Sequence, residues 1–592
     1  MAPDTWQTLT DMFFSQAHKM GDKPFLSAKV DGQYQSKSWA ETADEVMALA
    51  GALVEKGVKP GDRVLLVSEN RPEWCVADLA IMAAGAIAVP TYTTNTSRDH
   101  LHILENSAAV GSILSTKALA KNFFPAAHQS DALQFVICIE DPAIGQHLNF
   151  ETLDYKASIE VGKKHLSTVR KRMDSLTKED TACLIYTSGT GGAPKGVMLP
   201  HRAIMHNCRG AYDVLMELGI KDEVFLSFLP LSHAYEHSGG QFFPIYTGSQ
   251  IYYAQSLDKL ATNLQEVSPT IMMVVPRLFE MLRQRISAAI KKEGGLKAKL
   301  FDKAIEIGTK RLEERLSLID RLIDPFLTMT VRKKVQQRFG GRMKALVSGG
   351  APLNPDVGAF FQALGLRLLQ GYGQTEAGPV VSVNRPSLVK MDTVGPAVTG
   401  AEVRIADDGE ILVQGELVMQ GYWRDEAATN KAIINGWLHT GDIGHIDEDG
   451  HIKITDRKKD IIVNDKGDNV SPQRIEGMLA LEPEIMQAMV YGDKRPHLVA
   501  LIVPDPEWLS EWCLKNDVAN DIADLIDNKD LHKALDGAVR RVNERLSNLE
   551  KVRRFTLAKE AFTIENAQMT PTLKIRRHVI SKLYEQELID LY

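Results

Sequence analysis

Glycines, hydroxyl side chains and one lysine crowd residues 186–196, YTSGTGGAPKG. This stretch follows a short apolar run, residues 183–185, which is typical of the end of a buried strand. Backbone N–H groups, hydroxyls and an ammonium group suit an anion, and phosphate is the usual candidate. A Walker A loop requires glycine directly before its lysine. Because Pro194 precedes Lys195, the sequence excludes that NTPase loop, although a flexible surface loop remains open.

Two further glycine-rich turns lie downstream, in VSGGAPL (347–353) and LLQGYGQTEAG (368–378). Tyr372 offers a flat ring between glycines, Thr375 a hydroxyl and Glu376 a carboxylate. A carboxylate beside a phosphate-binding loop makes chemical sense when a cation lies between them, and Mg²⁺ with nucleotide is the usual one. Taken alone, Glu376 is also compatible with a carboxylate at a helix N-terminus.

The segment GWLHTGDIGHIDEDGHIKITDRKKD (436–460) places Asp442 in a glycine-bounded turn, where it can accept two hydrogen bonds from a ribose diol. Residues 447–449 are typical of a surface hairpin turn. Near the C-terminus, TPTLKIRR (570–577) places Lys574 between a proline and two arginines. Read alone, this last segment is a basic surface tail.

The elements that must position these residues follow an alternating pattern. Short apolar strands at 63–70, 87–92, 110–116 and 134–140, with a helical pattern at 73–86, predict βαβ units and sheets covered on both faces. A chain of 592 residues is too long for one core. We expect an α/β fold with a large N-terminal domain of layered α/β subdomains (1–455). A small α+β C-terminal lid domain (456–592) follows, joined through the charged hinge near Asp456.

Residues 283–344 contain seventeen Lys and Arg against seven Asp and Glu. The pattern predicts long helices, which we interpret as a solvated helical insertion. Two other interpretations stay open: a surface that lies against anionic lipid headgroups, and a patch that holds an anionic substrate or partner.

Composition limits the class of protein. A net charge of −7 argues against a general nucleic-acid binder. No apolar run approaches bilayer length, and the first residues lack a signal-peptide pattern. The five cysteines are scattered, odd in number and without metal-ligand spacing. We therefore expect a reduced, cytoplasmic setting, with peripheral contact at the inner face of a membrane left open and a homodimer compatible with the sequence.

Five ordered motifs, YTSGTGGAPKG, SGGAPL, YGQTE, TGD and PTLK, with DRKKD as the hinge, resemble the adenylate-forming (AMP-binding) superfamily over nearly the whole chain. FLPLSHAYEH (228–237), the hinge and the helical insertion resemble the long-chain fatty-acyl-CoA synthetase branch. The resemblance implies a ligase that uses ATP, Mg²⁺ and coenzyme A. A long-chain fatty acid would form acyl-AMP with release of pyrophosphate, and then acyl-CoA with release of AMP.

The resemblance also implies roles for individual residues. The β- and γ-phosphates would be held by the first motif: Thr187, Ser188, Gly189, Thr190, Gly192 and Lys195. Thr187 and Glu376 would hold Mg²⁺. Adenine would lie against Gly349, Gly350, Ala351, Gln370, Gly371, Tyr372 and Gly373. Asp442 would bind the ribose and Arg457 the ribose–phosphate region.

The implied catalytic set is Lys574, His233, Thr375 and Glu376. Lys574 would bridge the fatty-acid carboxylate and the α-phosphate, then leave as the hinge swings the lid for the coenzyme A step. His233 would lie by the carboxylate, with a purely structural histidine as the other interpretation. His237 falls where some relatives have an aromatic gate, so we assign no gate there.

Two positions depart from the pattern. Gly191 stands where relatives carry a hydroxyl residue, and Val463 where some carry a lysine. Neither removes the implied catalytic set. Two other functions stay open: the same chemistry on a medium-chain, aryl or sterol-side-chain carboxylate, and a non-catalytic protein that binds acyl chains or AMP.

Overall fold

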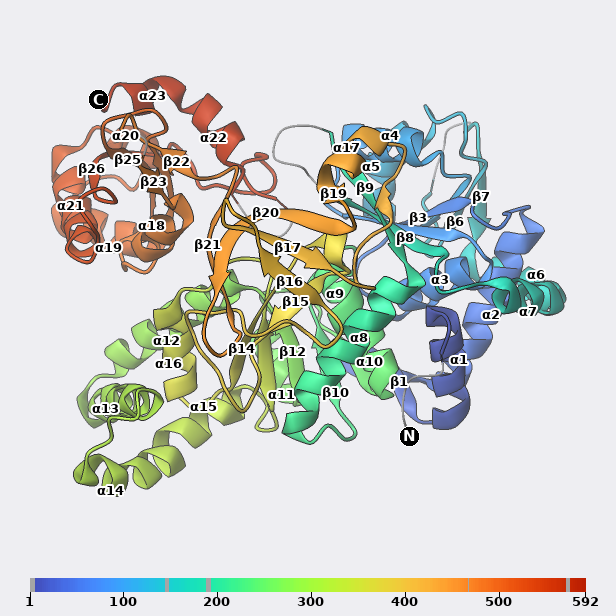
Figure 1. Cartoon of the computed structure of the whole chain (residues 1–592), viewed down its shortest axis with the longest axis horizontal. Helices are drawn as coiled ribbons and strands as arrows, with labels where there is room; N and C mark the ends of the chain where they lie inside the picture. Colours follow the sequence, from blue (N-terminus) through green and yellow to red (C-terminus); the bar gives the residue numbers. More distant parts are fainter. Residues whose placement is uncertain (1–5, 144–147, 188–192, 467, 571–574) are drawn as a thin grey trace.

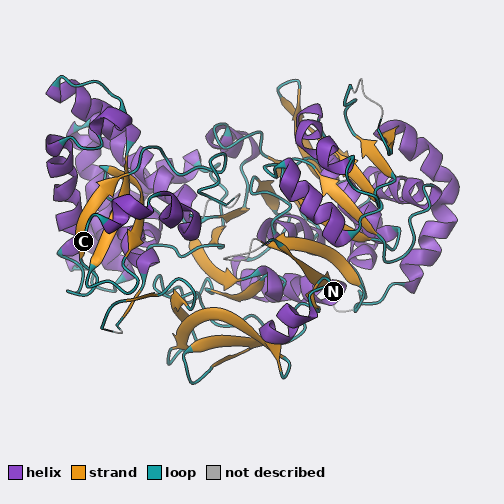
Figure 2. Ribbon diagram, turned by 90° about the horizontal axis from the view of Figure 1, so that it is seen from above, coloured by secondary structure: helices purple, strands orange, loops and turns teal. Residues whose placement is uncertain are grey.

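A computed structural model describes residues 6–143, 148–187, 193–466, 468–570 and 575–592. It has a large lobe and a smaller C-terminal lobe at the upper left of Figure 1. Helices lie on both sides of the strands in the right-hand part of Figure 2. The predicted α/β fold with a large N-terminal region and a small C-terminal region is confirmed.

The first eight-stranded sheet has the order β18-β9-β8-β4-β3-β5-β6-β7. Its strands are β3 (Arg63–Val67), β4 (Ile87–Thr91), β5 (Gly111–Leu114), β6 (Phe135–Cys138), β7 (Glu151–Asp154), β8 (Thr181–Thr187), β9 (Lys195–Pro200) and β18 (Gly421–Tyr422). The strands predicted at 63–70, 87–92, 110–116 and 134–140 are confirmed as β3 to β6, and the predicted helix as α3 (Pro72–Ala83). Strands β3 to β6 pair in parallel and are almost wholly buried, which explains their continuous apolar sequences.

The second eight-stranded sheet has the order β15-β14-β13-β12-β10-β11-β1-β2. Its strands are β1 (Pro24–Val30), β2 (Gln33–Ser38), β10 (Val224–Ser227), β11 (Gln250–Tyr253), β12 (Ile271–Val274), β13 (Ala345–Ser348), β14 (Leu368–Gly373) and β15 (Val380–Val383). Strands β12, β13 and β14 run in parallel. Their carboxyl ends therefore deliver the two downstream glycine-rich turns to one edge of the sheet, where open α/β sheets bind ligands.

An antiparallel sheet follows, made of β16 (Glu402–Ile405), β17 (Glu410–Gln414), β19 (Ile433–Ile434), β20 (Trp437–Ile446) and β21 (Ile452–Arg457). The predicted hairpin turn at 447–449 connects β20 and β21, and Asp447 and Asp449 both pair there with Lys390. Asp456 and Arg457 are the last residues of β21, so the chain leaves this sheet only after Arg457.

The helices of the large lobe flank these sheets. They are α1 (Leu9–Met20), α2 (Trp39–Glu55), α4 (Ser97–Ser107), α5 (Lys117–Ala127), α6 (Tyr155–Gly162), α7 (Leu166–Ser175), α8 (His201–Leu215), α9 (Ala234–Glu236), α10 (Phe243–Thr247), α11 (Leu260–Val267), α16 (Pro355–Ala363) and α17 (Glu426–Ala432). The basic insertion is helical, as predicted: α12 (Pro276–Glu293), α13 (Gly295–Leu312), α14 (Leu318–Leu327), the π-helix η4 (Thr328–Arg332) and α15 (Lys333–Arg338).

The C-terminal lobe is an α+β unit around its own apolar clusters. Its strands are β22 (Ile462–Val463), β23 (Asn469–Val470), β24 (Ile485–Tyr491), β25 (Leu498–Pro504) and β26 (Val552–Leu557). Its helices are α18 (Pro472–Leu479), α19 (Pro506–Asn516), α20 (Ile522–Leu525), α21 (Lys529–Asn543), α22 (Arg577–Leu583) and α23 (Glu585–Ile589). Separate cores allow the two lobes to move relative to one another without unfolding either.

Candidate active site

A cavity of about 2970 Å³ lies between the large sheets, the antiparallel sheet and the C-terminal lobe. Every predicted site residue that the structure describes lines it: Thr187, Lys195, His233, Gly349, Gly350, Ala351, Gln370, Gly371, Tyr372, Gly373, Thr375, Glu376, Asp442 and Arg457. Residues from six separate segments of the sequence therefore meet in one space. Ser188, Gly189, Thr190, Gly191, Gly192 and Lys574 lie outside the described residues.

The two ends of the first glycine-rich segment are held by strand pairing. Thr187 ends β8 and Lys195 begins β9, and the two residues are direct partners in the antiparallel ladder. The Lys195 ammonium lies 5.1 Å from the centre of the Tyr422 ring and 3.4 Å from Asp425 Oδ2. A positive charge is thus fixed at the rim of the cavity, beside the segment predicted to bind phosphate.

Tyr422 connects this lysine to the predicted metal ligand. Its hydroxyl donates a hydrogen bond to Glu376 Oε1 at 2.9 Å. Burial, followed by the negative charge of Glu376, raises the pKa of Tyr422. Tyr422 and Asp425 were not predicted from the sequence. The available signal was the aromatic pair before an acidic residue in GYWRDE (421–426), which pairs with β9 only in the folded chain.

A buried carboxylate organises the opposite wall. Asp442 Oδ2 accepts a hydrogen bond from the Tyr372 hydroxyl at 2.6 Å, and Oδ1 accepts one from Arg457 Nε at 3.0 Å. Burial is the largest single effect and on its own would lower the pKa of Arg457. The charge and hydrogen bond of Asp442, together with Asp460 and Tyr372, leave this pKa raised. Because each carboxylate oxygen has a second lone pair, Asp442 can still accept hydrogen bonds from a diol.

Glu410 holds this wall in place and was also missed from the sequence. It is buried, its Oε1 accepts a hydrogen bond from the Gly441 backbone at 2.8 Å, and its Oε2 lies 3.1 Å from both His439 and Lys458. Burial raises the pKa of Glu410, but these partners outweigh burial and leave it lowered. A single glutamate in the turn DDGE gives no sequence signal of this role.

The glycine turn after β13 gives close access to the cavity. A Cβ on Gly349 would lie 3.0 Å from the Tyr235 ring, and Gly350 has a φ of +83°, which favours glycine. On the neighbouring strand, Gln370 is buried, and its Oε1 accepts no hydrogen bond from any described residue. An unsatisfied acceptor in the wall of a cavity suits a ligand that carries an amino group, such as adenine.

The two histidines of FLPLSHAYEH have different environments. His233 lines the cavity, and its Nδ1 accepts a hydrogen bond from the Tyr235 backbone at 3.2 Å. His237 is fully buried, 2.9 Å from Asp78 Oδ2, and packs edge-on against Trp74. His237 is not among the described residues that line the cavity, which agrees with assigning no gate to it.

The lining of the cavity also includes a set of apolar residues. These residues come from α8, β12 and the helical turns after His233: Ala211, Val214, Leu215, Gly239, Phe243 and Met273. Polar, charge-rich residues and apolar residues thus line one cavity. This combination suits a ligand with one anionic end and one hydrocarbon end.

The AMP-binding enzyme model matches residues 13–423, and the AMP-binding enzyme C-terminal domain model matches residues 459–592. The chain belongs to the AMP-binding enzyme family. It is 33% identical to "Long-chain-fatty-acid--CoA ligase FadD15" of Mycobacterium tuberculosis, with 98% of this chain and 96% of the relative covered. It is 31% identical to the human "Long-chain-fatty-acid--CoA ligase 1", with 96% and 84% covered.

Solved structures of this fold agree over the full length. The adenylation domain of a carboxylate reductase from Mycobacterium chelonae matches with a TM-score of 0.76 at 21% identity, covering 100% of this chain and 92% of that one. The corresponding domain from Segniliparus rugosus, in complex with AMP and a co-purified carboxylic acid, matches with a TM-score of 0.75 at 22% identity, covering 99% and 94%. At these identities the likeness establishes the fold.

Within the described residues of this family member, no group of three or more His, Cys, Asp or Glu side chains could hold a metal ion by itself. Mg²⁺ at phosphoryl-transfer sites is usually bound through one or two carboxylates, waters and the substrate phosphates. The single carboxylate of Glu376, which lines the same cavity as Thr187, fits that mode of binding.

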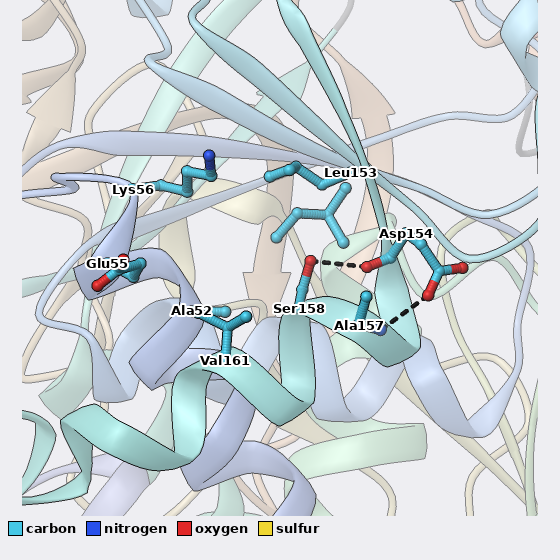
Figure 3. Close-up of a pocket in the computed structure, with 9 residues that line it drawn as sticks. Ala52, Glu55, Lys56, Leu153, Asp154, Ala157, Ser158 and Val161 are labelled. Carbon is cyan, nitrogen blue, oxygen red and sulfur yellow. Dashed lines mark hydrogen bonds between the residues drawn. The ribbon is translucent and has the colours of Figure 1, made fainter.

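A second, smaller cavity of about 280 Å³ lies between α2, α6 and β7 (Figure 3). Its polar groups are used locally: Ser158 Oγ donates to the Asp154 carbonyl, and the Ala157 N–H donates to Asp154 Oδ1, both at 2.7 Å. Lys56 pairs with Glu151 at 2.6 Å. These local bonds make it a poor candidate for chemistry.

Proposed function

We propose that this AMP-binding enzyme is a long-chain fatty acid–CoA ligase that forms acyl-AMP from a fatty acid and ATP, then acyl-CoA. One observation carries the proposal: the polar wall at Asp442, Tyr372 and Glu376 and the apolar residues of α8, β12 and the helical turns after His233 line the same cavity. Near-full-length similarity to proteins named long-chain-fatty-acid–CoA ligases supports the same activity.

In the first step an oxygen of the fatty-acid carboxylate bonds to the α-phosphorus of ATP, and the bond to the bridging oxygen of pyrophosphate breaks. Both reactants are anions, so positive and dipolar groups lower the barrier. We assign Lys195, Thr187 and the glycine-rich segment to the leaving pyrophosphate. Mg²⁺, when held by Glu376 and Thr187, supplies further neutralisation of the phosphate charge.

The remaining residues of the wall orient the nucleotide. We assign the ribose hydroxyls to Asp442, the ribose–phosphate region to Arg457, and adenine to Tyr372 and Gln370. Asp442 is fixed by two hydrogen bonds before any ligand arrives. A binding group that is already ordered loses little entropy on binding, which favours a precise nucleotide position.

In the second step the coenzyme A sulfur bonds to the acyl carbonyl carbon, its proton is released, and AMP departs with the bonding pair. We propose that Lys574 bridges the reactants in the first step only. Residues 456–592 would then act as a lid that rotates relative to residues 1–455 and removes Lys574.

The apolar lining residues support a hydrocarbon substrate, and we propose a long-chain fatty acid. The proposed setting is the reducing cytoplasm, because all five cysteines are buried free thiols. The similarity to long-chain-fatty-acid–CoA ligases does not favour the alternatives of a medium-chain, aryl or sterol-side-chain acid. A chain-length series in a thioester assay tests the long-chain assignment: acyl-CoA formation should be greatest with long saturated acids such as palmitate. A maximum with benzoate or octanoate would reassign the substrate, and no turnover with any acid would indicate a binding protein.

A further inference from the structure

Helix α14 and the π-helix η4 that continues it present an apolar face to solvent at the outer edge of the large lobe, where α14 lies at the lower left of Figure 1. The side chains of this face, with their exposed fractions, are Leu318 (79%), Ile319 (68%), Leu322 (81%), Phe326 (54%) and Met329 (75%). A soluble monomer scatters such residues singly, and a contiguous group marks a site of interaction. We refer to these five residues as the α14 face.

The spacing of these residues explains why they gather on one side. Positions 318, 322, 326 and 329 follow the three- and four-residue repeat that aligns side chains along a helix. The opposite side of α14 packs against the large lobe, where Leu327 is fully buried and joins a cluster with Ala304 and Ile307 of α13. The helix is therefore apolar on two sides, and only one of them has a partner.

The acidic residues of α14 point inward. Asp320 caps the helix through Ser317 and lies 3.7 Å from Lys310. Asp324 pairs with Arg311 at 3.1 Å and with Arg332 at 2.7 Å. Both carboxylates are thus neutralised between the helices of the insertion, and neither adds negative charge to the α14 face.

The residues beside the α14 face are basic. Arg321 lies next to Leu322 in the helix, and Lys333 follows four residues after Met329. Both are exposed, and neither forms an ion pair with another described residue. An apolar stripe bordered by unpaired cations matches a surface with hydrocarbon beneath and negative charge above, the chemistry of an anionic lipid interface.

Charge also favours an anionic lipid surface over a second copy of the chain as the partner of the α14 face. A two-fold contact through the α14 face would bring Arg321 and Lys333 close to the same residues of the other copy. Like charges at close range oppose such a contact. No helix of the described chain is long and apolar enough to span a membrane, so any membrane contact of these helices would be peripheral.

We propose that the α14 face docks on the surface of an anionic phospholipid bilayer, with Leu322, Phe326 and Met329 entering the interface and Arg321 and Lys333 contacting the headgroups. The proposal rests on the proposed function for its purpose, because long-chain fatty acids partition into bilayers and docking would hold the ligase at its substrate. The choice of this docking surface depends only on the exposed residues of and beside the α14 face, and not on the proposed function.

Sedimentation of the full chain with vesicles tests the proposal. The wild type should bind vesicles of phosphatidylcholine mixed equally with phosphatidylglycerol, bind pure phosphatidylcholine weakly, and be released by high salt. The variant Leu322→Ser/Phe326→Ser/Met329→Ser should bind both kinds of vesicle about tenfold or more weakly than the wild type. The variant Arg321→Glu/Lys333→Glu should lose the preference for anionic vesicles. Leu514→Ser, an 82%-exposed leucine of the C-terminal lobe, is the matched control and should bind as the wild type does.

Two outcomes would overturn the proposal. Equal vesicle binding by the wild type and the triple-serine variant would remove the α14 face from membrane contact. A concentration-dependent wild-type dimer that the same variant abolishes would assign the face to a second copy. All variants should form acyl-CoA normally from detergent-dispersed palmitate without vesicles. Normal ligase activity without vesicle binding refutes only the docking, and vesicle binding without ligase activity refutes only the proposed function.

Discussion

The two sides of the main cavity are built differently. On the large lobe, Asp442 is buried and bonded to both Tyr372 and Arg457, and Tyr422 is bonded to Glu376. On the C-terminal side, Leu481 packs against an apolar cluster of the large lobe, and several other contacts between the lobes are polar. Examples are the Arg545–Asp356 pair at 2.6 Å, with both side chains about half exposed, Arg277 donating to the Met486 carbonyl at 3.0 Å, and Gln284 donating to the Ala480 carbonyl.

This difference indicates a division of labour. Hydrogen bonds that are made before the ligand arrives fix a binding wall, whereas exposed ion pairs contribute little and exchange easily. The large lobe therefore supplies nucleotide position, and the C-terminal lobe supplies groups that are needed for one step and not for the other.

The largest effect should come from Lys574→Ala. Loss of a positive group from the transition state should slow acyl-adenylate formation by about 100-fold or more. Thioester formation from supplied acyl-adenylate should stay within a few fold of wild type. Lys559→Ala, which removes a lysine of the same lobe that pairs with Glu587, is the control. Equal losses in both half-reactions would refute the division of labour.

Asp442→Ala should weaken nucleotide binding. The change removes the acceptor for Tyr372 and Arg457 together with the proposed ribose contacts, so the KM for ATP should rise about 10- to 100-fold. Steady-state kinetics with ATP as the varied substrate measure this effect. Asp449→Ala, in the exposed turn of the same hairpin, should leave the KM unchanged. An unchanged KM for Asp442→Ala would exclude it from the nucleotide site.

Glu376→Gln should raise the Mg²⁺ concentration for half-maximal turnover about tenfold, because it removes a metal-binding charge but keeps an acceptor for the Tyr422 hydroxyl. Turnover at varied Mg²⁺ and fixed ATP measures the shift. Tyr422→Phe removes the hydrogen bond and keeps the carboxylate, so it should change the Mg²⁺ dependence less. A larger shift in Tyr422→Phe would mean that Glu376 acts through its position and not through its charge.

Asp456, at the junction of the two regions, gives a test by pH. Burial raises its pKa to about 6, with a further increase from Asp460. The unfolded chain loses this proton near its ordinary pKa of about 3.9, while the folded chain keeps it to about 6. The free energy of unfolding should therefore fall as the pH rises through this window.

Because Asp456 is partly exposed, the fall should be only about 1 kcal/mol, and Asp456→Asn should abolish it. Chemical denaturation of both proteins at about pH 4 and about pH 7 measures the difference. Parallel pH profiles for the wild type and Asp456→Asn would show that this carboxyl is solvated in the folded chain.

The smallest effect should come from Arg545→Ala. Loss of one exposed ion pair between the lobes should change the ratio of the two half-reaction rates less than about fivefold. Arg541→Ala, which removes pairs with Glu482 and Glu484 inside the C-terminal lobe, should not change the ratio. A tenfold or greater change for Arg545→Ala would mean that this contact holds a required state.

The sequence predicted the parts of the site that strand ends deliver. Gly349, Tyr372 and Asp442 lie in local motifs, and parallel strands that end at one edge bring the first two together. Tyr422 was missed because its role depends on pairing with β9, and Glu410 because its role depends on His439 and Gly441 of β20 and on Lys458. No local pattern encodes either role.

The basic insertion shows the same limit. The sequence revealed an excess of cations and predicted helices at 283–344, and the helices are confirmed. It could not show that Asp320 and Asp324 turn inward to Lys310, Arg311 and Arg332. Only tertiary packing leaves Leu322 and Phe326 on the outside.

Direct detection of the acyl-adenylate intermediate tests the proposed two-step ligase reaction. The enzyme is mixed with palmitate, ATP and Mg²⁺ in the absence of coenzyme A, and the quenched mixture is examined by mass spectrometry. Palmitoyl-AMP and pyrophosphate should form in equal amounts, and addition of coenzyme A should then convert palmitoyl-AMP to palmitoyl-CoA and AMP. Formation of ADP and phosphate, or of palmitoyl-CoA without any adenylate in a single turnover, would contradict the proposed reaction.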